Sequence, residues 1–236
     1  MGFLTFNSTS STELGVVIER YPQNIHASKR VHAYQIPGRS GDLTISDGAY
    51  NNYVQPYEVY FKGAANNMPE VARAVAAWLN APVGYVRLAD SYEPDVFRLA
   101  MYKSQTDIEN FINRFGRCTI EFECAPQRFL LSGETVQEFT SGGVIANPTA
   151  FPALPLIRVY GVGTVTINGT TLTINQMADG ASYTDIDCEA QNCYFETVNC
   201  NSFVTVSEFP KLTAGNNAVD FDGVSKVEIT PRWWTI

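Results

Sequence analysis

The sequence ends in Ile-Thr-Pro-Arg-Trp-Trp-Thr-Ile, residues 229–236, and this pair of adjacent tryptophans restricts the folds that are open to the chain. Each indole ring carries about 150–250 Å² of mostly apolar surface, which is unfavourable to leave in water. We therefore expect the segment to be tied into a packed sheet. Because adjacent residues on a strand point to opposite faces, one of Trp233 and Trp234 can fill a core and the other needs a second surface. That second surface is a first indication of a partner.

Apolar residues that alternate with polar ones, between turns rich in Gly, Asn, Asp and Pro, predict a mainly β chain. In the first half of the sequence the expected strands are 15–20, 57–62, 84–88, 98–102 and 117–124. The last of these places Cys118, Ile120, Phe122 and Cys124 on one face. This pattern predicts that both cysteines are small residues of a core.

One helix is clear in the sequence, from Pro69 in its first turn to a stop at Pro82. Its apolar stripe consists of Val71, Val75, Trp78 and Leu79. A stripe at this spacing predicts a helix that covers one face of a sheet. A second, short helix is considered at 106–111, where a threonine offers an N-terminal cap.

Ser- and Gly-rich composition between residues 131 and 147 marks a domain boundary, after which three prolines enforce an extended chain. We predict one domain at 1–131, a linker at 132–144 and a second domain at 145–236. The second domain reads as an all-β sandwich, with strands expected at 165–174, 183–188, 203–206, 219–221 and 227–229.

The strongest signal in the second domain is a hairpin over 165–174 with Asn168-Gly169 in its turn. A four-residue loop would pair Ile167 with Leu172, whereas a two-residue loop would pair Val165 with Leu172. Both registers keep the apolar residues on one face, so the sandwich prediction holds for either.

The charge balance argues against a nucleic-acid binder. The chain has 16 Lys and Arg against 24 Asp and Glu, a net charge of −8, and no basic cluster to displace counterions. An acidic channel would still let DNA slide without sticking, because carboxylates repel phosphates. The start of the chain lacks the features of a signal peptide, and no apolar run approaches the roughly 20 residues that span a bilayer. We expect no membrane partner and a chain made and initially used in a cytosol.

No pattern in the sequence predicts an active site. The five cysteines are odd in number and lack the close ligand pairs of zinc sites, which predicts free thiols. Pairs of carboxylates such as Asp185 and Asp187 lie two residues apart, as on the polar face of a strand. Motifs for phosphate, dinucleotide or zinc binding are missing from the sequence. We therefore expect no catalytic residue, no metal and no cofactor, and a protein that is not an enzyme.

Three stretches, taken together and in order, resemble the distal tail protein family of phages with long non-contractile tails. The first is Ile36-Pro37-Gly38-Arg39-Ser40-Gly41-Asp42-Leu43, followed by Asp47-Gly48-Ala49-Tyr50-Asn51-Asn52. The second runs from Asn147 to Gly161, and the third is the C-terminal segment described above. The resemblance spans nearly the whole chain. It implies an N-terminal β domain similar to tail tube proteins, with one helix, and a galectin-like C-terminal β-sandwich.

The same resemblance implies partners and a location. Six copies of the N-terminal domain would close into a ring between the tail tube protein and the tail-tip hub protein, a tail-associated lysin. Receptor-binding or baseplate proteins would dock on the C-terminal domain, and DNA would pass through the ring without specific binding. The protein would reside in the tail tip of the virion after assembly in the host cytoplasm.

The glycine-rich loop has two interpretations. It is either a solvated loop with glycines at positive φ or a subunit contact in which Arg39 reaches a carboxylate or backbone carbonyl of a neighbour. The family resemblance favours the contact. The residues expected at subunit or partner interfaces are Pro37, Gly38, Arg39, Gly41, Tyr50, Arg232, Trp233 and Trp234. The alternative function is a lectin-like module that binds carbohydrate of the host cell wall, since Tyr and Trp rings also stack on sugars.

Overall fold

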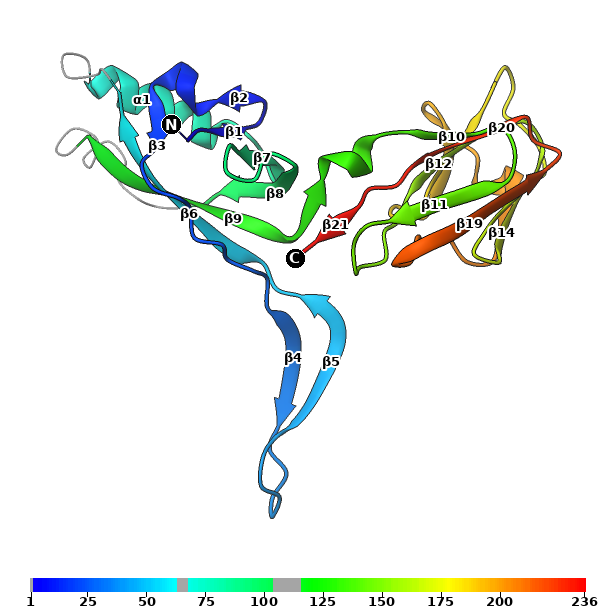
Figure 1. The fold of residues 1–236 in the computed structure, drawn as a ribbon, viewed down its shortest axis with the longest axis horizontal. Coiled ribbons are helices and arrows are strands. Elements are labelled where there is room, and N and C mark those ends of the chain that lie inside the picture. Colours follow the sequence, from blue (N-terminus) through cyan, green and yellow to red (C-terminus); the bar gives the residue numbers. More distant parts are fainter. Residues whose placement is uncertain (1, 63–67, 104–115) are drawn as a thin grey trace. The chain divides into compact units, whose positions relative to one another are not determined.

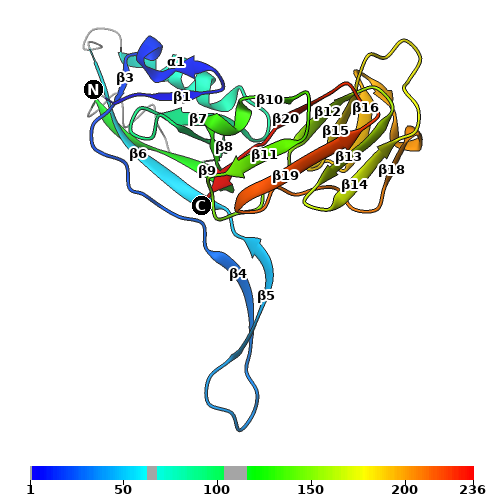
Figure 2. The ribbon, with the colours of Figure 1, turned by 45° about the vertical axis from the view of Figure 1, so that its right-hand side comes forward.

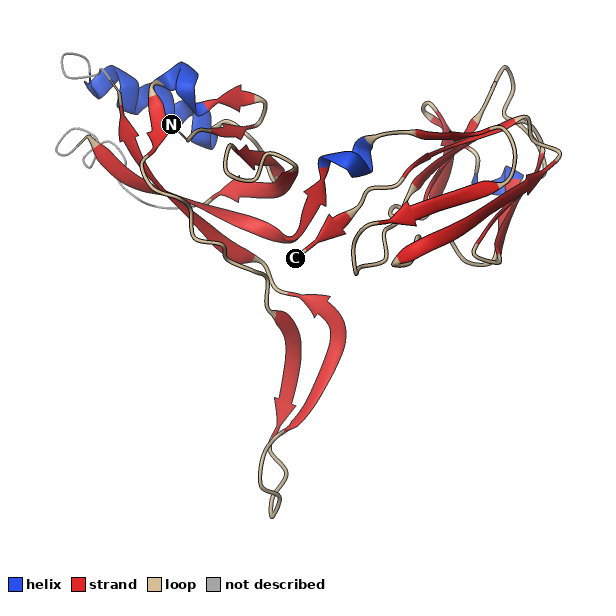
Figure 3. Ribbon diagram, in the orientation of Figure 1, coloured by secondary structure: helices blue, strands red, loops and turns tan. Residues whose placement is uncertain are grey.

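The computed structural model describes residues 2–62, 68–103 and 116–236, and the chain divides into two compact units. The first unit comprises residues 1–128 with Ile236, and the second comprises 129–235. Strands dominate both units, as Figure 3 shows, and α1 (Met68–Asn80) is the single α-helix of the described chain. The prediction of a mainly β fold with one clear helix is confirmed. The short helix considered at 106–111 lies outside the described residues.

The first unit is built on one curled sheet in the order β2-β1-β7-β8-β9-β6-β3. The strands are β1 (Leu4–Phe6), β2 (Thr9–Ser10), β3 (Val16–Ile18), β6 (Tyr53–Phe61), β7 (Val86–Asp90), β8 (Val96–Tyr102) and β9 (Arg117–Leu130), with the 3-10 turn η1 (Ser11–Leu14). An isolated bridge from Gly2 to Ile18 brings the two ends of this order together, so the sheet approaches a closed barrel.

Helix α1 packs its predicted stripe against the inside of this sheet. Val75 and Leu79 are buried, and Val71 and Trp78 are partly buried against the same core. On β9 the buried positions alternate, so that Cys118, Ile120, Phe122 and Cys124 face the core, as the sequence predicts. The helix and the sheet thus share one apolar core.

A two-stranded hairpin leaves this sheet. Strands β4 (Lys29–Tyr34) and β5 (Leu43–Tyr50) pair only with each other among the described strands, and they extend away from the rest of the first unit (Figures 1 and 2). We call residues 29–50 the arm. The sequence prediction treated this region as a loop and missed both strands.

The second unit is a sandwich of two sheets. One has the order β10-β20-β12-β15-β16-β17 and the other β11-β19-β13-β14-β18. The strands of these two sheets are β10 (Gln137–Phe139), β11 (Gly143–Asn147), β12 (Leu156–Tyr160), β13 (Gly163–Ile167), β14 (Thr170–Ile174), β15 (Thr184–Asp187), β16 (Asn192–Phe195), β17 (Val198–Asn199), β18 (Val204–Val206), β19 (Gly215–Asp222) and β20 (Lys226–Thr230). The second unit also contains the 3-10 turns η2 (Leu131–Glu134) and η3 (Asn201–Phe203). Strand β21 (Trp234–Thr235) lies outside both sheets and pairs with β9.

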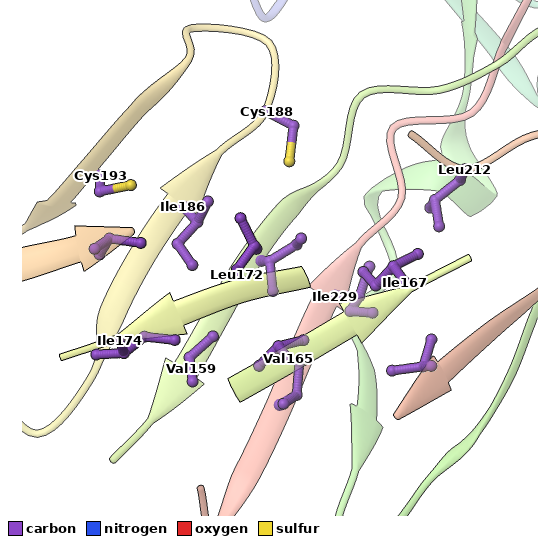
Figure 4. Packing of buried hydrophobic residues seen from close by; sticks show 14 of the residues in the cluster. Val159, Val165, Ile167, Leu172, Ile174, Ile186, Cys188, Cys193, Leu212 and Ile229 are labelled. Atoms are coloured by element: carbon purple, nitrogen blue, oxygen red, sulfur yellow. The ribbon is translucent and has the colours of Figure 1, made fainter. Parts of the chain in front are cut away.

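Side chains from both sheets meet in one core, which Figure 4 shows from close by. Val159, Ile186 and Ile229 come from the first sheet, and Val165 and Leu172 come from the second. The remaining cysteines of the chain, at positions 188, 193 and 200, are buried in the same core as free thiols. Burial raises the pKa of Cys193 to about 11 and that of Cys188 to about 12.

The structure selects the two-residue turn for the hairpin of β13 and β14. Val165 pairs with Leu172 and Ile167 pairs with Thr170. Asn168 and Gly169 both have positive φ, 49° and 82°, as a type I′ turn requires. The segment 132–144, expected as a linker, is instead ordered into η2, β10 and the start of β11. Its Ser and Gly residues serve turns within the second unit.

Candidate assembly interface

The arm presents an apolar face without a cover. Tyr34 pairs with Leu43 and His32 pairs with Ile45, so these four side chains lie on the same face of the hairpin. Tyr34, Leu43 and Ile45 are 54%, 39% and 52% exposed. The opposite face carries Ala33 with Thr44 and Val31 with Ser46. Val31 is exposed on this opposite face, so both faces of the arm carry apolar side chains, with more of them on the face of Tyr34, Leu43 and Ile45, and neither face packs on a core.

Polar contacts fix the base of the arm. The Arg30 Nε donates to Asp47 Oδ2 at 2.6 Å, and the Ala49 N–H donates to Asp47 Oδ1 at 2.9 Å. The backbone hydrogen bond from Ala49, followed by that from Arg30, lowers the pKa of Asp47 below its ordinary value. Gly48, with φ of 79°, lies within β5 at the irregular stretch where the pairing shifts between Val31 with Ser46 and Lys29 with Tyr50. These local contacts keep the two strands paired although the arm is exposed.

The tip of the arm contains the predicted glycine-rich loop. Gly38 and Gly41 have φ of 80° and 82°, and the Arg39 N–H donates to the Ile36 carbonyl at 3.1 Å. The Arg39 side chain forms no ion pair with any described residue. An open hollow of about 510 Å³ is lined by Gln35, Ile36, Pro37, Arg39, Gly41 and Asp42. The loop thus offers a cation and its backbone to solvent, as a contact loop would.

Tyr50 lies at the other end of the arm, opposite Lys29, and is half-buried. The predicted residues 37, 38, 39, 41 and 50 therefore all belong to one hairpin of the first unit. The sequence prediction missed the larger part of this surface, which is the apolar stripe of Tyr34, Leu43 and Ile45. The signal was present, because Leu43 and Ile45 alternate with Thr44 and Ser46.

The predicted C-terminal residues belong to the second unit, and each has contacts there. Arg232 donates to both carboxylate oxygens of Asp187, at 2.8 and 2.9 Å, and its N–H donates to the Gly133 carbonyl. This bidentate pair lowers the pKa of Asp187 and raises that of Arg232. Arg232 has φ of 58°, a conformation that is uncommon outside glycine.

The two tryptophans separate as the strand geometry predicts, but both find their surfaces within the second unit. Trp233 is 2% exposed and fills the core, so its ring is available only to its own unit. Trp234 stacks on Phe151, with ring centroids 4.6 Å apart and planes inclined by 27°. Its indole Nε1 donates to the Pro152 carbonyl at 2.9 Å. The second surface that the sequence analysis predicted for one of the two tryptophans is therefore the ring of Phe151, in the same chain.

The C-terminal backbone is held closely as well. The Leu130 N–H donates to the Trp233 carbonyl at 2.9 Å, where β21 pairs with the end of β9. A side chain at Gly133 would begin 2.3 Å from the Trp233 nitrogen, so only glycine fits there. In the described part of the chain, no helix has the length and apolar character that crossing a bilayer requires.

Comparison with known proteins gives a family match within the first unit. Residues 10–124 match a family described as a phage tail protein RIFT-related domain. A search of curated proteins gives no match. The matched stretch includes the arm and most of the curled sheet.

Solved structures extend the likeness to the whole chain. The fold is similar to that of the Dit (gp 19.1) protein of phage SPP1, described as a paradigm of the hub adsorption apparatus in phages that infect Gram-positive hosts, with a TM-score of 0.77, 12% identity and 100% of both chains covered. Chains of the phage P2 baseplate in its activated conformation also match, with calcium at TM-score 0.51 and with strontium at 0.53, each at 10% identity over 97% of both chains. The predicted resemblance to phage distal tail proteins is confirmed.

Proposed function

We propose that this chain, whose residues 10–124 match a phage tail protein domain and whose fold is that of the SPP1 Dit protein, is a structural protein of a phage tail tip. In this proposal six copies form a ring that joins the tail tube to the tail-tip hub. The second unit docks receptor-binding or baseplate proteins. The observation that carries the proposal is the uncovered apolar face of the arm.

The apolar face needs a partner. Three large apolar side chains, Tyr34, Leu43 and Ile45, lie together on a hairpin that has no core beneath it. Contiguous exposed apolar surface of this kind marks an interaction site in soluble proteins. A two-stranded hairpin is marginally stable by itself, so a partner that covers this face would also stabilise the arm.

A second copy of the chain offers a suitable surface. On the outer face of β6 and β9, Val54 lies opposite Glu123 and Glu58 lies opposite Thr119, with Glu121 exposed between them. Glu58 on this face pairs with Arg20 and Glu123 pairs with Lys103, which leaves Glu121 as the acid beside the apolar side chain of Val54. The arm carries Lys29 and Arg39, and its third cation, Arg30, is already paired with Asp47. Opposite charges around an apolar centre give the complementarity that guides protein association.

The geometry of such a contact favours a ring. The arm and the outer face of β6 and β9 are two different patches of one unit, so a contact between them is heterologous. A heterologous contact closes into a ring when the rotation between subunits closes. The net charge of −8 suits a ring through which DNA passes without binding, since acidic walls repel phosphate.

The lectin alternative receives less support from the rings that it would use. One face of the Trp234 indole is stacked on Phe151, and its N–H is already bonded to a carbonyl. On the sheet that contains β12 and β20, the Arg158 guanidinium lies 3.9 Å from the centroid of the Tyr183 ring. The Lys226 ammonium lies 4.4 Å from the centroid of the Tyr160 ring. Rings occupied in this way offer fewer free faces to a sugar.

Negative-stain images of the purified protein test the proposal. Annular particles with a central hole support a ring. Fields of single compact particles at a micromolar protein concentration would contradict it. Calorimetric titration with host wall polysaccharide tests the alternative, because saturable heat that is lost in Trp234→Ala would favour a lectin.

A further inference from the structure

The segment that leads into the arm is held to the first unit by side chains and not by strand pairing. Residues 20–28, which we call the strap, connect β3 to β4 and belong to no strand. Ile25 and Ala27 pack partly on the core of the first unit. The strap therefore lies against the unit without belonging to its sheet.

Two buried side chains grip the backbone of the strap. Gln55 Nε2 donates to the Gln23 carbonyl at 2.9 Å. Arg128 Nη2 donates to Asn24 Oδ1 at 2.7 Å and to the Ile25 carbonyl at 2.5 Å. Gln55 and Arg128 are almost fully buried, so these contacts are shielded from water. Hydrogen bonds from a buried cation are stronger than those between neutral groups.

The grip is anchored in the sheet by a chain of ion pairs. Arg128 pairs with Glu93 at 3.3 Å, and Glu93 also pairs with Arg98. Arg98 pairs with Asp90 at 3.2 Å, and Asp90 accepts a hydrogen bond from the Tyr57 hydroxyl at 2.8 Å. The strap is thus bound to side chains of β6, β7, β8 and β9 through one connected network.

Two buried polar atoms of the network have no partner within the described chain. Gln55 Oε1 and Arg128 Nε are buried and have no hydrogen-bond partner among the described residues. A cavity of about 10 Å³, room for a single water, lies between the strap and Asp90, Glu93 and Arg98.

We propose that the strap is a latch for the arm. While Arg128 and Gln55 grip it, the arm has one direction relative to the sheet of the first unit. When the grip is lost, the arm swings as a paired hairpin while the sheet stays folded. The latch sets the direction in which the arm meets a neighbouring copy, so it rests on the proposed ring contact and concerns its regulation.

The position of Arg128 in the chain links the strap to the second unit. Arg128 is the last residue of the first unit before the chain enters the second unit at Phe129. A pull on the chain at this junction acts directly on the residue that holds Asn24 and Ile25. In this proposal, docking of a partner on the second unit is transmitted to the arm, because it shifts the strap between its held and its released state.

Spin-label distances within one chain test the latch. Labels on Ser40→Cys, in the arm tip, and Thr119→Cys, on the outer face of β9, report the direction of the arm by double electron–electron resonance. The five natural cysteines are buried and do not compete for the label. Dilution with an excess of unlabelled protein restricts the signal to distances within a chain, and every protein in the series also carries Leu43→Asp, so that no neighbouring copy holds the arm.

Arg128→Met is the main variant, and Asn24→Ala is a second variant that leaves every buried side chain in place. Arg117→Met is the matched control, because Arg117 lies on the same strand and its ion pair with Glu19 is exposed. We expect one narrow distance in the parent and the control, a distribution at least about twice as broad in Arg128→Met, and a smaller broadening in Asn24→Ala. Equal widths in all four proteins, or a broad distribution in the parent, would overturn the latch. The expected broadening, together with an unmodified chain that is monomeric, would contradict the ring alone.

Discussion

Tyr34 and Leu43 lie directly opposite each other across the arm, and both side chains are exposed on the same face. A pair of this kind usually covers a core, because opposite residues on a hairpin stabilise a sheet by packing together on its buried side. Here no core lies beneath them within the described first unit. The pair is the centre of the surface that we assign to a second copy of the chain.

A charge at the centre of this surface is expected to weaken assembly. Leu43→Asp places a carboxylate where the ring contact would bury it, and an unpaired buried charge costs several kcal/mol. We expect the concentration at half-assembly to rise at least about tenfold, equivalent to roughly 1.4 kcal/mol. Thr44→Asp is the control, since Thr44 is the next residue and points to the opposite face. If Leu43→Asp and Thr44→Asp weaken assembly equally, the added charge affects assembly regardless of the face of the arm on which it lies, and the assigned surface is wrong.

The two C-terminal tryptophans should differ in their contribution to stability. Trp233→Ala empties a position in the core of the second unit and should lower the free energy of unfolding by about 3–5 kcal/mol. Trp234→Ala removes a half-exposed ring stacked on Phe151 and should cost about 1–2 kcal/mol. Urea denaturation followed by circular dichroism measures both. Similar losses for the two variants would mean that the rings share one environment.

Gly133 is expected to be irreplaceable for a steric reason. A methyl group at this position meets the Trp233 backbone nitrogen at 2.3 Å, and a backbone atom cannot rotate away. Gly133→Ala should therefore destabilise the second unit by about 3 kcal/mol. Gly169→Ala is the control that measures backbone strain without steric overlap, because Gly169 has φ of 82° and no atom lies near its side-chain position. This substitution should lower the free energy of unfolding by roughly 1 kcal/mol. Urea denaturation midpoints show which of the two variants loses more stability, and an equal loss would contradict the steric explanation for Gly133.

The ion pair between Arg232 and Asp187 should make the second unit sensitive to acid. Asp187 has a folded-state pKa below its ordinary value of 3.8, chiefly because Arg232 donates to it. A lowered pKa contributes stability that is fully present above the unfolded value and is lost as the pH falls through the folded value. The loss therefore falls below about pH 4. Asp187→Asn should lose less stability than the parent between pH 6 and pH 3, and an identical loss would exclude this pair as a source of the acid sensitivity.

The parts of the fold that follow local patterns could be predicted from the sequence. Alternation placed Cys118, Ile120 and Phe122 on the buried face of β9, and helical spacing placed Val75 and Leu79 against the core. The Asn168-Gly169 turn could be located but its register could not, because both registers bury the same residues. The structure decides it through the positive φ of both turn residues.

The parts that depend on distant residues could not be predicted. Arg128 lies about a hundred positions after its partners Asn24 and Ile25, and no local pattern relates the strap to a buried cation. Trp234 was expected to need a partner because nothing in the sequence places Phe151 beside it. The arm was interpreted as a loop although Leu43 and Ile45 alternate with Thr44 and Ser46, because the glycines and the proline of its tip dominate the local pattern and neither strand is buried.

Sedimentation equilibrium of the full chain tests the ring most directly. Six chains of 26.1 kDa give a particle of about 157 kDa, and we expect this mass for the parent and for Thr44→Asp at micromolar concentration. Leu43→Asp should shift towards the mass of a single chain under the same conditions. A parent protein that sediments as 26.1 kDa throughout would contradict a ring built through the arm.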